Sequence, residues 1–174
     1  MGVGKDWFVL HAFEAGAHSS AGYMAFRPKD VSELTVPGPN SEFALKALRL
    51  RGLRRQVPKG LRVGSLPALI RSANSVGAVV TIHLEKLAPE TCYIGRVAAI
   101  TPRELELHEI TPGAKWNRAT TVFRLADISR VDFGGPYEDA LARIGGPPPA
   151  PKGRELWPRH VPGWSPRSGK IRGR

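Results

Sequence analysis

The sequence lacks most of the features from which a function is usually assigned. Among its 174 residues it has one cysteine, Cys92, which excludes an internal disulfide and a zinc site built from several cysteines. No apolar run approaches the roughly 18 residues that a transmembrane helix needs, and the N-terminus does not have the layout of a signal peptide. We therefore expect a cytoplasmic protein with no membrane partner.

Enzyme signatures are also scarce. Residues 2–5 (GVGK) have the end of a phosphate-binding loop, but no strand precedes them and no Ser or Thr follows the lysine. His83 and Glu85 would share one face of a strand. The same spacing occurs at Glu106 and His108, and we interpret both pairs as solvated outer faces rather than as a metal site. We predict a non-enzymatic protein with no catalytic residue, no metal and no small-molecule cofactor.

Positive charge is plentiful and unevenly distributed. The formal net charge is +11, yet residues 1–40 and 76–145 are each close to neutral. Residues 41–75 hold eight Lys and Arg side chains against one acidic residue, and residues 146–174 hold seven against one. Such cationic segments attract phosphate groups without a shaped pocket, and their affinity depends strongly on salt.

The first basic segment is the best candidate for contact with phosphates. A helix expected over 41–51 has one apolar side and ends beside a basic loop. The alternative is a core helix with a solvated basic face. The predicted nucleic-acid-binding residues of this segment are Arg49, Arg51, Arg54, Arg55, Lys59 and Arg62.

The second basic segment, residues 146–174, is rich in proline and glycine, which favours an extended or disordered chain. Its Trp157 and Trp164 are spaced like docking anchors, either for a partner or for the body of this protein. The cations of this tail would add phosphate contacts. They are Arg167, Lys170, Arg172 and Arg174.

Residues 65–145 show the clearest secondary-structure pattern. Ser65 is a candidate N-cap for a short helix, and alternating apolar residues then indicate five short strands. Short strands in meander order have to curl to protect their edges, so we expect a mostly-β fold with a small five-stranded barrel. The expected elements are a helix over 66–74, strands over 79–84, 92–100, 104–110, 121–125 and 128–133, and a helix over 137–144.

The N-terminal part of the chain repeats the end of this unit. The pattern F-R-x-x-D-[V/I]-S-x-[L/V] occurs at residues 26–34 and again at 123–131. Each copy precedes a turn that contains Gly or Pro and then an expected helix, so we expect a degenerate second copy of the barrel. The expected organisation is an N-terminal partial barrel with its helix (1–52), a basic linker (53–64), a barrel with a closing helix (65–145) and the tail (146–174).

These elements resemble the Sm-like (LSm) small β-barrel, which belongs to the same general class as SH3-like barrels. The resemblance covers about residues 65–133 and rests on a helix before five strands, on Gly95 inside the second strand, and on F-R-x-x-x-I-x-x-V at 123–131. It implies a barrel of this kind and an RNA partner. Residues 127–141 (DISRVDFGGPYEDAL) also resemble a segment of uncharacterised bacterial proteins, from which no activity follows.

The sequence departs from the Sm-like pattern where that family contacts uridine. Leu125 follows Arg124 in place of the glycine of the family's Arg-Gly step, and the turn at 101–103 has neither Asp nor Asn. The uridine-binding residues of the family are therefore not found at matching positions.

Together these features predict a non-enzymatic module that binds nucleic acid, with RNA favoured, through the phosphates. The alternative is a protein–protein adaptor or an assembly subunit, which would pair barrel edges, as Sm proteins do in their rings, and would dock through Trp157 and Trp164. Phosphate contacts would weaken with salt, whereas docking through tryptophans would survive moderate salt.

Overall fold

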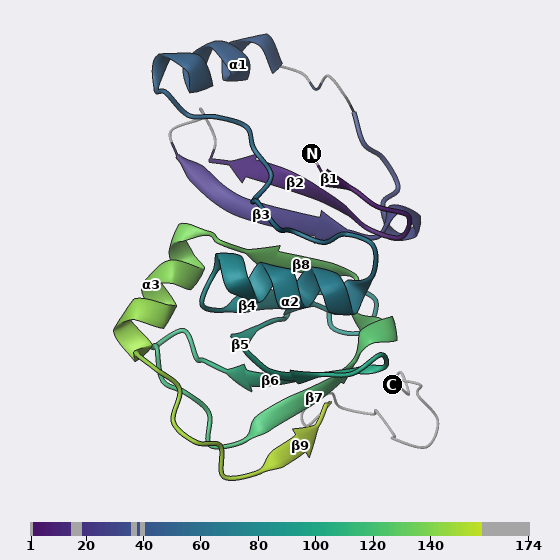
Figure 1. Ribbon diagram of the computed structural model, residues 1–174, viewed down its shortest axis with the longest axis vertical. Coiled ribbons are helices and arrows are strands. Elements are labelled where there is room, and N and C mark those ends of the chain that lie inside the picture. Colours follow the sequence, from purple (N-terminus) through teal and green to yellow (C-terminus); the bar gives the residue numbers. More distant parts are fainter. Residues whose placement is uncertain (1, 15–18, 36–37, 39–40, 158–174) are drawn as a thin grey trace.

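The computed structural model describes residues 2–14, 19–35, 38 and 41–157 (Figure 1). In this part of the chain, nine strands form one sheet in the order β1-β2-β3-β8-β4-β5-β6-β7-β9. The strands are β1 (Gly2–Val3), β2 (Phe8–Phe13), β3 (Ser20–Phe26), β4 (Val80–His83), β5 (Cys92–Ile100), β6 (Glu104–Glu109), β7 (Thr120–Arg124), β8 (Arg130–Phe133) and β9 (Arg154–Leu156). The helices are α1 (Ser41–Leu50), α2 (Leu66–Val76) and α3 (Pro136–Gly145), with short 3-10 helices η1 (Pro28–Asp30) and η2 (Leu125–Asp127). No helix of the described ranges combines the length and the apolar character needed to cross a bilayer.

The prediction of a mostly-β protein is confirmed, but the sheet is open and differs from a specific five-stranded barrel. Strand β8 pairs antiparallel with β4 on one side and with β3 on the other. Because β8 offers this second edge, the N-terminal strands continue the same sheet, as Figure 1 shows. The register aligns Tyr23 of β3 with Phe133 of β8, whose rings stack with centroids 5.4 Å apart.

The sequence repeat has a structural counterpart at two corners of the sheet. Strand β3 leads into η1 and strand β7 leads into η2. Arg27 pairs with Asp30 across the first corner, at 2.5 Å, and Arg124 pairs with Asp127 across the second, at 2.7 Å. After η2 the chain enters β8, whereas after η1 the described residues 31–35 form no strand.

Helix α2 forms one side of the core. Ser65 caps it as predicted, with its hydroxyl accepting from the backbone N–H of Ala68. Figure 1 shows α2 lying across the sheet over β4 and β8. The inward face of the helix follows the helical repeat and consists of Leu66, Leu69, Ile70 and Ala73, all buried. The predicted helix over 66–74 is therefore present and runs two residues further.

Strand β5 matches its predicted range, and Gly95 in its interior has the expected role. A Cβ atom at Gly95 would run into the backbone carbonyl of His108 on β6. The two strands approach closely at this point, and the register shifts between Val97 and Ala99 further along β5.

Of the two states expected for the tail, disordered or extended, its first part takes the extended one and forms a strand. Strand β9 pairs in parallel with β7, and Trp157 is only 8% exposed. The indole lies 6.2 Å from the rings of both Tyr93 and Phe123, between centroids. Burial of one large aromatic side chain offsets the ordering cost that the Pro/Gly-rich composition imposes. As a result β9 covers the outer edge of β7.

Candidate nucleic-acid interface

The cations of the predicted basic segment are exposed, although apolar residues between them are half-buried. All six of its predicted binding residues have exposed side chains, and within the described part of the chain none of them pairs with a carboxylate. Five arginines elsewhere do form such pairs. They are Arg27, Arg124, Arg130, Arg143 and Arg154. Exposed cations without an ion pair also occur elsewhere in the described chain, for example Arg96, Arg103 and Arg118, but residues 49–62 gather six of them in one stretch.

The end of α1 fixes how the chain enters this segment. The backbone N–H of Leu53 donates to the carbonyl of Leu48 at 2.9 Å, and that of Gly52 donates to Arg49 at 3.1 Å. Gly52 has φ +66°, so the turn is a Schellman motif with glycine at its left-handed position. Leu48 is buried, and the turn carries the chain directly from Arg51 to the following basic residues.

The segment is attached to the body of the protein and is not a free linker. The backbone N–H of Gln56 donates to Nδ1 of His11 on β2 at 3.3 Å, and that of Arg62 donates to the hydroxyl of Ser72 on α2 at 3.0 Å. Leu61 and Val63 pack against the core, so Arg62 between them faces outward. Figure 1 shows this stretch descending from α1 past the N-terminal strands to α2.

His11 is the anchor on the sheet side. Its ring lies 4.2 Å from that of Phe13 and 4.6 Å from that of Tyr23, and its Nε2 is 2.9 Å from the hydroxyl of Ser20. Burial lowers the pKa of His11 below its usual value. The neutral ring leaves Nδ1 free to accept the N–H of Gln56.

A hollow of about 320 Å³ lies where the basic segment meets α2. Arg71 lines it from the helix and is not among the binding residues that the sequence predicts. Its place could not be found from local sequence, because the fold brings residues 60–62 against α2. The lining residues are Gly60, Arg62, Ala68, Arg71, Ser72 and Ser75.

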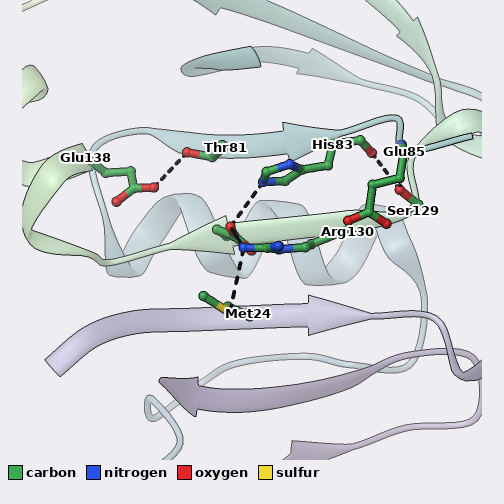
Figure 2. Close-up of polar contacts among 8 residues, drawn as sticks. Met24, Thr81, His83, Glu85, Ser129, Arg130 and Glu138 are labelled. Atoms are coloured by element: carbon green, nitrogen blue, oxygen red, sulfur yellow. Dashed lines mark hydrogen bonds and ion pairs between the residues drawn. The ribbon is translucent and has the colours of Figure 1, made fainter. Parts of the chain in front are cut away.

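The face of β4 and β8 turned away from α2 carries a separate polar network (Figure 2). Asp132 accepts hydrogen bonds from Nε and Nη2 of Arg130 at 2.8 and 2.6 Å, and it lies 3.1 Å from Nε2 of His83. Nearby, Thr81 donates to Glu138 at 2.7 Å. Burial alone would raise the pKa of Asp132, but the hydrogen bonds from His83 and Arg130 outweigh burial and hold it below its ordinary value.

Cys92 lies beside this network. Cys92 pairs with His83 in the register of β4 and β5, so thiol, imidazole and the carboxylate of Asp132 come from three neighbouring strands. Burial, followed by the negative charge of Asp132, raises the pKa of Cys92. The thiol is therefore held in its protonated form, which is the opposite of what a cysteine nucleophile needs.

In the two His–carboxylate pairs predicted as solvated outer faces, Glu85 is exposed as expected, but the histidines are covered. His83 is mostly covered and bonded to Asp132. His108 is only 4% exposed, donates from Nε2 to the backbone carbonyl of Asn117 at 2.7 Å, and lies 5.3 Å from the ring of Trp116. Among the described residues, no three His, Cys, Asp or Glu side chains gather as metal ligands.

Of the predicted site residues in the tail, the structure describes only Trp157. Of the two roles predicted for Trp157, docking to a partner or to the body of its own chain, the structure shows the second, because the indole packs into the core. Trp164 and the four tail cations lie outside the described residues. These cations are Arg167, Lys170, Arg172 and Arg174.

Comparisons of this chain with protein-family models, with curated proteins and with solved structures find no match.

Proposed function

We propose that this chain is a non-enzymatic nucleic-acid-binding module that contacts the phosphates of RNA through its basic segment. The observation that carries the proposal is the set of six exposed cations at 49–62 that have no carboxylate partner in the described structure. Cations that are already paired gain little from a phosphate, whereas unpaired ones bind it and release its counterions.

Attachment of the segment strengthens this proposal. The bonds of Gln56 to His11 and of Arg62 to Ser72 hold the backbone in place before any ligand arrives. A segment that is ordered beforehand loses less conformational entropy on binding. Tail cations beyond residue 157 would add to the same interaction.

We also propose that strands β4 to β8 are related to the Sm-like barrel. In support, β8 returns to pair with β4 after the η2 corner, and α2 precedes β4. Such a relation favours RNA as the partner. The family's uridine-contacting residues have no counterparts here, so recognition would run through phosphates and would be largely blind to sequence.

Charge reversal tests the proposal. We expect the double variant Arg54→Glu/Arg55→Glu to bind a labelled single-stranded oligouridylate at least about tenfold more weakly, because two phosphate contacts become repulsive. The slope of log affinity against log salt should also become shallower, by about 0.7 for each lost contact. The matched control Arg118→Glu changes an exposed arginine in the loop before β7 and should alter binding little.

If net charge alone governed binding, Arg118→Glu would lose about half as much in log affinity as the double variant, because it reverses one charge and not two. An unchanged affinity in the double variant would remove the segment from the site.

One observation favours a protein partner as the second candidate function. Phe43 and Leu50 on α1 are 63% and 88% exposed, and both point away from buried Leu48. Two other features predicted for an adaptor, a free strand edge and Trp157, are engaged within the chain itself. Strand β9 covers the edge of β7, and Trp157 lies in the core. Binding through α1 would persist at high salt and would be lost in Phe43→Ser, which separates it from phosphate contact.

A further inference from the structure

The hollow between the basic segment and α2 is lined by cations and hydroxyls and by no carboxylate. On the helix side, Ala68, Arg71, Ser72 and Ser75 follow the spacing of a single helical face, opposite the buried face of α2. On the other side lies the turn that carries Gly60, whose φ is +82°. With a volume of about 320 Å³, the hollow is at the small end of ligand sites.

The two arginines are positioned by separate contacts. Nη2 of Arg71 donates to the carbonyl of Ile100 at 2.9 Å, which orients the guanidinium and leaves its other N–H groups available. The backbone of Arg62 is fixed by its bond to Ser72, while its side chain has no carboxylate partner among the described residues.

The hydroxyls are engaged by their own helix. Ser72 donates toward the carbonyls of Ala68 and Leu69, both at 2.9 Å, and Ser75 donates to the carbonyl of Arg71 at 3.3 Å. The donors left for a ligand are therefore cationic, which suits an anion whose oxygens can accept from two guanidinium groups.

We propose that this hollow seats one phosphodiester group of the bound RNA, held jointly by Arg62 and Arg71. This inference rests on the proposed function and makes it more specific. One phosphate is bound in the hollow, and the other cations of 49–62 attract the RNA by long-range electrostatics. Arg71 thereby becomes a binding residue that fixes where the strand crosses α2.

Two arginines that hold the same phosphate and two arginines that act only through long-range electrostatic attraction give different losses of affinity in a double variant. If Arg62 and Arg71 hold the same group, removing either one disables the seat, and removing the second costs little more. Arginines that act independently through the field give losses that multiply. Arg54 and Arg55 provide this comparison, because neither lines the hollow.

The experiment measures binding of a labelled single-stranded oligouridylate at fixed salt. We expect Arg62→Gln and Arg71→Gln each to lose about tenfold, as for a hydrogen bond to a charged group, and the double variant to lose little more than either alone. The pair Arg54→Gln/Arg55→Gln should show losses that multiply, and Arg118→Gln should lose less than about twofold. Multiplying losses at Arg62 and Arg71 would overturn the seat while leaving RNA binding in place.

Two further measurements test the hollow independently of the arginine substitutions. Ser75→Glu places a carboxylate in the hollow without touching the bond of Arg71 to Ile100, so it should weaken binding as Arg71→Gln does. A titration with inorganic phosphate, followed by NMR at the amides of Gly60 and Ser72, probes the hollow without RNA.

If the wild type binds no oligouridylate, the proposed function and the phosphodiester seat both fail. A phosphate response that disappears in Arg71→Gln would then assign the hollow to a free phosphate group, and no response would leave no anion site at all.

Discussion

Replacement of Trp157 by alanine should destabilise the whole protein. The indole is 8% exposed and packs between Tyr93 and Phe123. A Trp side chain that buries about 150 to 250 Å² contributes about 4 to 6 kcal/mol at 25 cal/mol per Å². Residual burial in the unfolded chain reduces this to about 3 to 5 kcal/mol, the usual cost of removing a large aromatic from a core.

Urea and thermal unfolding measure this loss directly. For a chain of this length the change corresponds to a fall in Tm of roughly 10 °C. Leu156→Ala is the matched control, because Leu156 is the neighbouring residue on β9 and its side chain is exposed. We expect that control to lose less than about 0.5 kcal/mol.

The same substitution should release β9 from the edge of β7. Trypsin should then cleave after Lys152 or Arg154 faster in Trp157→Ala than in the control, since local opening exposes the backbone. A loss of stability below about 1 kcal/mol, with unchanged cleavage, would refute the assignment of Trp157 to the core and would return it to the role of a partner anchor.

Three further outcomes follow from the structure. Gly95→Ala forces a Cβ against the carbonyl of His108 and should cost about 1 to 3 kcal/mol in urea unfolding; a neutral result would contradict the close approach of β5 and β6. Because the pKa of His11 is lowered in the folded protein, its contribution to stability is complete above pH 6.5 and is lost as pH falls below that value. A His11→Asn variant should lack this part of the dependence of stability on pH. An identical dependence in the variant would count against the lowered pKa. Asp132→Asn removes the partner of Arg130 and should destabilise the protein. The loss of stability as pH falls below 3.8 should also be smaller in this variant, because Asp132 has its lowered pKa only in the folded protein. Unchanged acid unfolding would argue against the network.

Local patterns predicted the central elements well. Alternation of apolar residues located strands β4 to β8, and β5 was placed at its observed limits. Ser65 and the helical spacing that follows it located α2 and its buried face. These features depend on neighbours within a few residues, which a single sequence displays.

Contacts between distant segments could not be predicted in this way. The pairing of β3 with β8 joins residues more than a hundred positions apart, and nothing in either strand marks the other as its neighbour. Strand β9 could not be predicted because the composition around it favours disorder. It is held by contacts of Trp157 with Tyr93 and Phe123, which lie far away in the sequence. Arg71 joined the candidate site only because Ser72 anchors the basic segment against α2.

The salt dependence of RNA binding by the unmodified protein tests the central claim most directly. Titration of a single-stranded oligouridylate between about 50 and 200 mM salt gives the slope of log affinity against log salt. Six phosphate contacts at residues 49–62 predict a slope of about −4 on a single strand. A slope near zero, or no binding at the lowest salt, would contradict the account.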